Sequence, residues 1–282
     1  MSNYLKGFNT GILTHEEGFL ALALKAKTSN DQTHLFYFQA EALRDLMMIL
    51  QNRLVSLQNN ATPGQQELAA LFEKANQELV NNLPVMEQKD VEQPDPGCIV
   101  TTLSVSLEEQ GFKLLFILKN ETLHHIKVSD AQIQFLMMAI ARALDLIKNV
   151  NLIGLLTANI NYVPVYDAEF KQNGAIDYSL LESEPWKLEL FNQFMLIIYG
   201  IENKDGLELK LGAVIKTHAA VTEQEIDVIA RNIASKSKRL MEYTHQLAII
   251  KTKPLAFNKG GTPSPQEALQ PLAEFHKALR MK

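Results

Sequence analysis

The stretch KVSDAQIQFLMMAIARAL (127–144) indicates how the chain is built. Ser129 and Gln132 form an S-x-x-Q capping box, which marks a helix start because the two residues satisfy each other's backbone N–H groups. After it, Ile133, Leu136 and Ile140 recur at helical spacing and form one apolar face. The pattern therefore predicts a helix over 129–147 that buries this face.

A similar pattern occurs at two other places in the chain. In VTEQEIDVIARNI (221–233), Thr222 and Glu225 supply the capping box. The earlier copy, FQAEALRDLMMILQNRL (38–54), has Gln39 at the cap position and so a weaker start. The matching apolar residues are Ile226, Ile229 and Ile233, at an offset of 93 from the first triplet, and Leu43, Leu46 and Leu50. We predict helices over 39–57 and 222–240 at equivalent positions.

Each predicted helix follows a hairpin whose turn ends in glycine: EEGF (16–19), EQGF (109–112) and KDGL (204–207). Glycine there can supply the positive φ that tight hairpin turns require. Because 282 residues divided by three is 94, we infer three divergent strand–turn–strand–(strand)–helix units of about that length. The predicted fold class is α+β, with antiparallel sheets, helices packed on one face and a C-terminal helix.

The segments between the units give the expected domain organisation. PVMEQKDVEQPDPG (84–97) is acidic and rich in proline, which favours a linker and domain boundary. The third helix is expected to continue through LMEYTHQLAII (240–250), and Ser264 is expected to cap the last helix. The expected parts are a first unit with an extra helix (1–83), the linker (84–97), a second unit (98–150), an irregular insertion (151–185), a third unit (186–250), and a mobile loop followed by the C-terminal helix (251–282).

Composition limits the possible environments. The net charge of -5 and pI near 5.8 create no global basic field that would attract nucleic acid or anionic lipid. The single cysteine, Cys98, excludes an internal disulfide framework. The N-terminal sequence lacks the pattern of a signal peptide, and the apolar runs are shorter than the ~20 residues of a membrane span. We therefore expect a cytoplasmic protein that does not insert into a membrane.

The chain resembles a known family in two segments and in its length. KGFNTGILT (6–14), FQAEALRDLM (38–47) and the length of 282 residues are similar to the YjeJ family of uncharacterised enterobacterial proteins. The resemblance covers most of the chain and includes no catalytic motif. It implies a bacterial, cytoplasmic origin and no particular activity.

A search for catalytic and metal-binding patterns indicates neither a cofactor nor a metal. The chain lacks phosphate-loop, dinucleotide, zinc-protease, C-x-x-C and nucleophile-elbow motifs. The glycine-rich NKGGTP (258–263) is interpreted as a flexible linker because no strand precedes it. The seven histidines include no pair at i, i+4, so surface or turn positions are favoured over a zinc site.

Two further groups of residues allow a functional and a structural interpretation. Asp167 and Glu169 are two positions apart and could form an acid–base pair, but we favour a solvated acidic loop because no partner motif is nearby. Methionines on the apolar helices, such as Met47 and Met138, could line an adaptable partner groove. Core filling is the favoured interpretation because these positions neighbour the apolar face.

The segment 231–259 is the strongest functional candidate in the sequence. It has seven basic residues and one acidic residue, Glu242, and so a charge of about +6 by this count. It could contact a polyanion or a protein partner. The residues concerned are Arg231, Lys236, Lys238, Arg239, Lys251 and Lys253, with Lys259 in the same segment.

We therefore expect a non-enzymatic binding or assembly protein with a protein partner or a homo-oligomeric state, since repetition without a catalytic motif builds surfaces. The alternatives are a nucleic-acid-associated factor that uses 231–259, and an enzyme with an unrecognised carboxylate site. A nucleic-acid partner is not favoured because no stacking aromatic residues accompany the basic segment.

Overall fold

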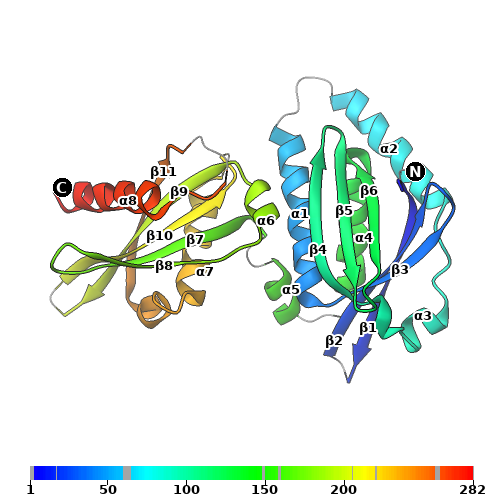
Figure 1. Ribbon diagram of the computed structural model, residues 1–282, viewed down its shortest axis with the longest axis horizontal. Helices are drawn as coiled ribbons and strands as arrows, with labels where there is room; N and C mark the ends of the chain where they lie inside the picture. Colours follow the sequence, from blue (N-terminus) through cyan, green and yellow to red (C-terminus); the bar gives the residue numbers. More distant parts are fainter. Residues whose placement is uncertain are drawn as a thin grey trace. The chain divides into compact units, whose positions relative to one another are not determined.

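The chain forms two compact units, residues Met1–Ile160 and Asn161–Lys282 (Figure 1). A computed structural model describes residues 3–16, 18–59, 65–147, 150–157, 160–204, 206–219, 221–257 and 261–281. The chain divides at 160/161, and not within 84–97, where the sequence predicted a boundary. The first two predicted units lie together in unit 1, and the third lies in unit 2.

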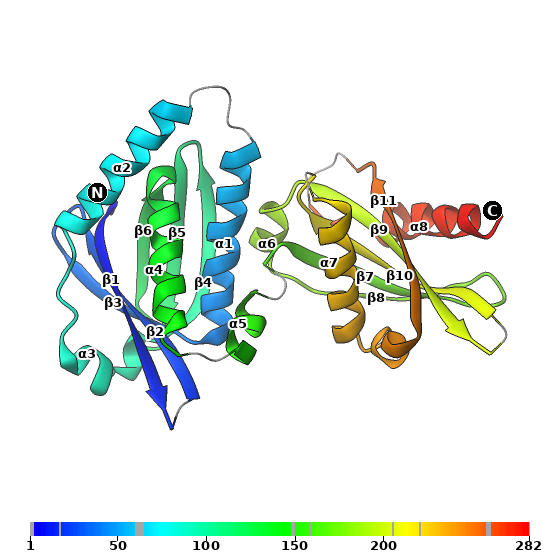
Figure 2. The same cartoon turned by 180° about the vertical axis from the view of Figure 1, so that it is seen from behind.

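Unit 1 contains two three-stranded antiparallel sheets, with the strand orders β1-β2-β3 and β4-β5-β6. Each sheet is a meander followed by a helix, α1 after β3 and α4 after β6. Helices α1 and α4 lie side by side (Figure 2); α1 contacts β4 of the second sheet, and α4 contacts β1 of the first. The strands are β1 (Leu5–His15), β2 (Gly18–Thr28), β3 (Thr33–Phe38), β4 (Val100–Glu108), β5 (Gly111–Leu118) and β6 (Leu123–Ser129). The helices are α1 (Ala40–Asn59), α2 (Gln65–Asn81), α3 (Gln88–Glu92), η1 (Pro96–Cys98), η2 (Asp130–Gln132), α4 (Ile133–Asp145) and α5 (Val150–Thr157).

The apolar faces of α1 and α4 form part of the core of unit 1, as the sequence pattern predicted. Leu43, Leu46 and Leu50 are fully buried, and Leu136 is 2% exposed. The predicted capping box at Ser129 and Gln132 is present, although it begins the short 3-10 turn η2 before α4. Arg53, in the C-terminal half of α1, donates two hydrogen bonds to Asp130 in that turn, at 2.7 and 2.8 Å, and so connects α1 to the start of the second helix.

The segment 84–97 is a packed part of unit 1. Lys25 of β2 forms an ion pair of 2.6 Å with the buried carboxylate of Asp90, and the Tyr37 hydroxyl donates to the Asp90 carbonyl at 2.7 Å. Met86 and Val91 pack on the outer face of the β1-β2-β3 sheet. The linker predicted from the acidic, proline-rich composition is therefore not observed, because two apolar side chains and one buried ion pair attach the segment to the sheet.

Unit 2 is a five-stranded antiparallel sheet with the strand order β11-β9-β10-β7-β8. Helix α7 packs on one face and α8 on the other (Figure 1). The strands are β7 (Tyr162–Phe170), β8 (Ile176–Leu180), β9 (Gln193–Asn203), β10 (Gly206–Thr217) and β11 (Leu247–Leu255). The helices are α6 (Pro185–Glu189), α7 (Glu223–Lys236), η3 (Met241–Gln246) and α8 (Pro265–Arg280).

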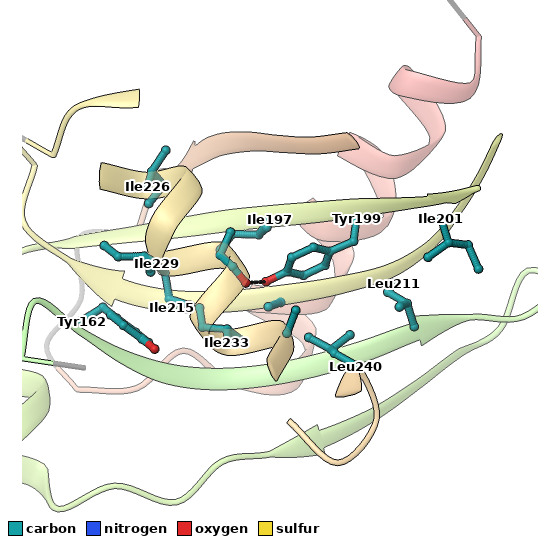
Figure 3. Packing of buried hydrophobic residues seen from close by; sticks show 13 residues of the cluster. Tyr162, Ile197, Tyr199, Ile201, Leu211, Ile215, Ile226, Ile229, Ile233 and Leu240 are labelled. Carbon is teal, nitrogen blue, oxygen red and sulfur yellow. Dashed lines mark hydrogen bonds between the residues drawn. The ribbon is translucent and has the colours of Figure 1, made fainter. Parts of the chain in front are cut away.

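The core on the α7 face explains why this helix docks on the sheet (Figure 3). Ile226, Ile229 and Ile233, the predicted apolar triplet, are all buried against β9 and β10. The buried Tyr199 hydroxyl of β9 donates to the Ala230 carbonyl at 3.0 Å, so its polar atom is satisfied within the core. The predicted capping box of Thr222 and Glu225 is also present.

On the opposite face, a glycine allows α8 to approach the sheet. A Cβ atom at Gly212 of β10 would lie 3.1 Å from Leu272 of α8 and 3.2 Å from Phe170 of β7. Ser264 and Glu267 form the capping box of α8, which confirms the predicted start of the C-terminal helix.

Three local predictions between residues 151 and 265 were wrong. The segment 151–185, predicted as irregular, contributes α5 to unit 1 and the strands β7 and β8 to the sheet. The third helix ends at Lys236, and 247–255 forms β11 on the edge of β9 where a helix and then a mobile loop were predicted. Residues 258–260 lie outside the described residues. Pairing with β9 satisfies backbone groups that an isolated segment would leave to solvent.

The three predicted units differ in how the third strand is supplied. In unit 1 the third strand follows the hairpin, as β3 and β6 do. In unit 2 the third strand beside β10 is β7, which precedes the hairpin. The hairpin turns differ too: Gly206 has a φ of +114°, but in the first hairpin Glu16, with φ of +47°, has the positive value in place of Gly18. The α+β class, the antiparallel sheets and the C-terminal helix are confirmed.

Candidate functional site

The predicted basic segment does not form one surface. Arg231 pairs with Asp227 on α7 at 2.8 Å, and Lys236 and Lys238 are exposed near the end of that helix. Lys251 and Lys253 lie on β11 and point towards α8, on the other face of the sheet. Arg239 is directed into the protein. The structure therefore separates the residues that the sequence placed together, and Lys259 lies outside the described residues.

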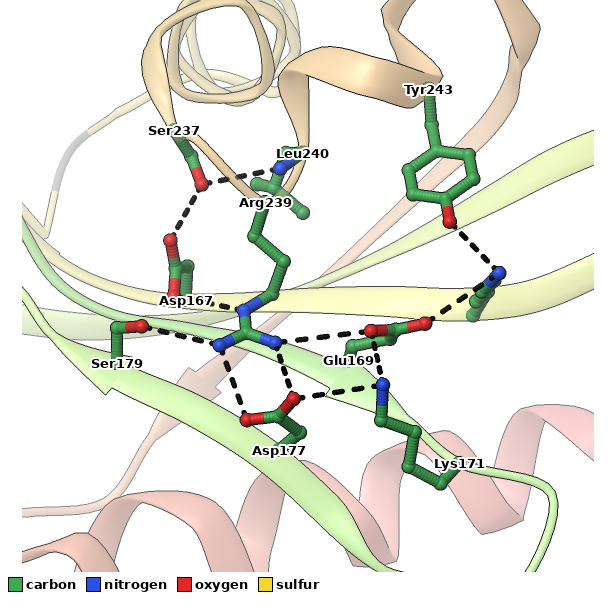
Figure 4. A network of polar contacts seen from close by, with 10 residues as sticks. Asp167, Glu169, Lys171, Asp177, Ser179, Ser237, Arg239, Leu240 and Tyr243 are labelled. Carbon is green, nitrogen blue, oxygen red and sulfur yellow. Dashed lines mark hydrogen bonds and ion pairs between the residues drawn. The ribbon is translucent and has the colours of Figure 1, made fainter.

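Arg239 is the centre of a network of carboxylates (Figure 4). Its guanidinium nitrogens lie 3.4 Å from Asp167, 3.0 Å from Asp177 and 3.8 Å from Glu169. The Ser237 hydroxyl, which comes before Arg239 in the same turn, donates to Asp167 at 2.6 Å. This network joins β7 and β8 to the connection between α7 and η3.

A β-bulge at Val165 directs the two predicted carboxylates towards this network. Tyr166 pairs with Val214 and Pro164 pairs with Ile215, so Val165 is an extra residue in β7. An extra residue changes the face on which the following side chains lie. Asp167 and Glu169 therefore face Arg239, and Tyr166 and Phe170 face α8. The solvated acidic loop favoured from the sequence is wrong, because Asp167 is 3% exposed on a strand.

The charges in the network are balanced. Lys171 and Lys210 lie 2.6 and 3.6 Å from Glu169, so three cations oppose three carboxylates. The hydrogen bond from Lys171 lowers the pKa of Glu169, and the hydrogen bond from Arg239 lowers the pKa of Asp177. A carboxylate that acts as a general acid near neutral pH needs a raised pKa. The arrangement therefore favours a structural role over acid–base catalysis.

The face that carries α8 has a groove, which we call the α8 groove. It has a volume of about 500 Å³, within the range of ligand-binding sites, and is partly open to solvent. Residues of four elements meet there, because α8 ends over the adjoining ends of β7, β10 and β11. The lining residues are Phe170, Lys171, Gln172, Leu207, Glu208, Leu209, Ile249, Lys251, His276, Leu279 and Arg280. A second hollow of about 410 Å³, which shares Phe170, His276 and Arg280, adds Lys277.

His276 fixes one wall of the α8 groove. Its ring stacks on Phe170 with centroids 3.8 Å apart and an interplanar angle of 6°. Its Nε2 atom lies 2.7 Å from the Leu209 carbonyl, which makes it the hydrogen-bond donor in the tautomer that carries a proton there. Burial lowers the pKa of His276, so the ring is neutral at pH 7. The wall is thus held by one stacking contact and one hydrogen bond.

Three basic side chains at the α8 groove have no acidic partner within ion-pair distance in the described parts of the chain: Lys251, Lys277 and Arg280. Lys171, in contrast, is paired with Glu169 and Asp177. Only Lys251 of the three belonged to the predicted basic segment. Sequence reasoning missed Lys277 and Arg280 because basic residues in the last turn of a helix are commonly explained by its dipole.

The other candidate residues remain separate from this groove. Met47 and Met48 are buried, as core filling predicted, but Met138 is 41% exposed. His34 and His124 meet with ring centroids 4.9 Å apart, next to Phe36. Within the described residues, no group of three or more His, Cys, Asp or Glu side chains could hold a metal ion. No helix in the described ranges is both long enough and apolar enough to cross a lipid bilayer.

Comparison with known proteins identifies the family. The sequence profile of the YjeJ-like family matches residues 1–282. A relative from Escherichia coli (strain K12), named "Uncharacterized protein YjeJ", is 29% identical over 245 residues, which cover 85% of this chain and 83% of the relative. No solved structure matches the chain. Because the match of the family profile extends over the whole sequence, the chain belongs to the YjeJ-like family.

Proposed function

We propose that this chain is a non-enzymatic cytoplasmic binding or assembly protein, and that the α8 groove is where it binds a protein partner. The observation that carries the proposal is the combination, in one concave site, of exposed apolar side chains with cations that have no acidic partner among the described residues. Leu207 is 51% exposed there, beside Leu209, Ile249 and Leu279. Concave sites with an apolar floor and a few convergent polar groups are typical of binding sites.

Two features of unit 2 support a binding role over the alternatives. The carboxylates that an enzyme could use are paired with cations in the Arg239 network. The basic segment that nucleic acid could use lies on two faces of the sheet, and Arg239 is taken up by the network. One face of the Phe170 ring is covered by His276, which leaves less aromatic surface for a base to stack on.

The test selects ligands without assuming their chemistry. A library of random, displayed peptides is panned against the full-length chain, and fluorescence anisotropy then measures the affinity of the selected peptides. The block variant Leu207→Asn/Leu279→Asn removes apolar surface from the groove. The control is Val228→Asn, which changes a side chain that is 59% exposed on α7, on the other face of the sheet.

We expect the block variant to weaken binding at least tenfold and the control to leave it unchanged. Sedimentation velocity of the same variants tests whether the partner is a second copy, since self-association through the groove would be lost in the block variant. If no selected peptide and no self-association depends on the groove, the proposal is wrong. Binding of DNA or RNA by the wild type would instead favour the nucleic-acid alternative.

A further inference from the structure

We infer that the α8 groove recognises an acidic, apolar peptide segment, in which side-chain carboxylates flank large apolar residues. This inference rests on the proposed function and specifies the chemistry of the partner. The carboxylates would meet Lys251 and Arg280, and the apolar side chains would pack on Leu207 and Leu279.

The positive charge at the groove comes from two independent elements. Arg280 ends α8, and its position alone could be explained by the dipole of the helix. Lys251 belongs to β11 and has no such explanation, yet it lines the same groove. Both side chains lack an acidic partner among the described residues. Charge complementarity therefore calls for an anionic partner, and an arginine is suited to a carboxylate because it can donate two parallel hydrogen bonds.

The apolar part of the groove limits which anionic partner fits. Leu207 and Leu279 come from β10 and α8, and with Ile249 of β11 they form an apolar area next to the cations. A partner that carries only charge would leave this area in contact with water or cover it without gain. A peptide can place an apolar side chain there and gain about 25 cal/mol for each Å² that it removes from water.

The groove has an ordered wall before any ligand binds. The stack of Phe170 on His276 and the hydrogen bond of His276 to the Leu209 carbonyl hold α8 against the sheet. Binding to a wall that is already ordered loses less conformational entropy than binding to a mobile one. The volume of about 500 Å³ takes a short segment and not a folded domain.

The test uses three capped hexapeptides and the full-length chain. The acidic probe alternates glutamate with leucine and phenylalanine, the neutral probe has glutamine at every glutamate position, and the basic probe has lysine there. Isothermal titration calorimetry at two salt concentrations measures each Kd. The charge variant is Lys251→Gln/Arg280→Gln, and Lys238→Gln, an exposed lysine on the α7 side, is the control.

We expect the acidic probe to bind at least tenfold more tightly than the neutral probe, and the basic probe not to bind. The charge variant should lose this preference and most of the salt dependence, and the control should keep both. If the neutral probe binds as tightly as the acidic one and Leu207→Asn/Leu279→Asn abolishes that binding, the groove is a site but its proposed ligand class is wrong. If a single-stranded oligonucleotide binds through Lys251 and Arg280, the inference is overturned.

Failure of the proposed function gives a different result. In that case neither the probes nor any selected peptide would bind in a way that depends on Leu207 and Leu279. Leu207, Lys251, Leu279 and Arg280 are at least partly exposed, so we expect the variants to fold. Circular dichroism of each variant before titration checks this and excludes loss of folding as the cause.

Discussion

Arg239 provides the sharpest test of the energetics of unit 2. The substitution Arg239→Met keeps much of the side-chain volume and removes the charge. Three carboxylates would then face two lysines, and one of the carboxylates, Asp167, is 3% exposed. A buried charge that loses its partner must be protonated, solvated by rearrangement, or left uncompensated, and each of these lowers stability.

The size of the effect follows from the surroundings of Asp167. Removing one partner of a fully buried ion pair costs about 3–5 kcal/mol. Two features reduce this range here: Asp167 keeps the hydrogen bond from Ser237 at 2.6 Å, and the Asp177 side chain is 51% exposed, so solvent screens its loss. We therefore expect Arg239→Met to lower the free energy of unfolding of unit 2 by about 2–4 kcal/mol.

A natural probe reports on this unit. Trp186 is the one tryptophan of the sequence and lies in α6 of unit 2, so its fluorescence during urea unfolding follows unit 2. The matched control is Arg231→Met, which removes a solvent-exposed pair with Asp227 at 2.8 Å and should cost at most about 1 kcal/mol. In the double variant Asp167→Asn/Arg239→Met, the neutral amide no longer needs a cation. The loss of unfolding free energy in the double variant should therefore be smaller than the sum of the losses in the two single variants, by about 0.5–3 kcal/mol.

The effect should also depend on pH in a defined direction. The hydrogen bond from Arg239 lowers the pKa of Asp177 below its ordinary value of 3.8. Such a group contributes stability above the ordinary pKa, and the contribution is lost as the pH falls through the lowered one. The difference between wild type and Arg239→Met should therefore be full at pH 7 and shrink below about pH 4. A loss under about 0.5 kcal/mol at pH 7, equal to that of Arg231→Met, would refute the buried-pair reasoning.

Three further predictions concern other parts of the chain. Leu136→Ala should destabilise unit 1 by about 2–5 kcal/mol in urea unfolding followed by far-UV circular dichroism. Met138→Ala, two residues along the same helix and 41% exposed, should cost under about 1 kcal/mol, and equal losses would contradict the assigned face. Gly111→Ala should lower the melting temperature and cost about 1–3 kcal/mol, because the added Cβ would lie 2.2 Å from a main-chain carbonyl oxygen of β6; an unchanged melting temperature would mean that the hairpin differs from the one described. The wild type should show no appreciable affinity for duplex DNA at low salt in electrophoretic mobility shifts, and changing Lys236, Lys238 and Arg239 to Gln should alter the stability of the protein and not its DNA binding. Micromolar, salt-sensitive DNA binding that this triple variant abolishes would overturn the prediction.

The sequence by itself determined the elements whose signals are local. The capping boxes at Ser129, Thr222 and Ser264 start helices because each is completed within four residues. The three apolar triplets lie in the cores because helical spacing places them on one face whatever the helix packs against. The hairpins before the helices, and so the α+β class, followed from alternating strands around short turns.

Tertiary structure decided what depends on partners distant in the sequence. β7 and β11 become strands because they pair with β10 and β9, and neither pairing has a local signal in 151–185 or 240–265. One extra residue at Val165 decides that Asp167 meets Arg239, which follows it by 72 residues. The α8 groove depends on how α8 crosses the sheet over Gly212. Capping and periodicity are energies between near neighbours, whereas strand pairing, bulges and charge neutralisation are energies between segments that only the folded chain brings together.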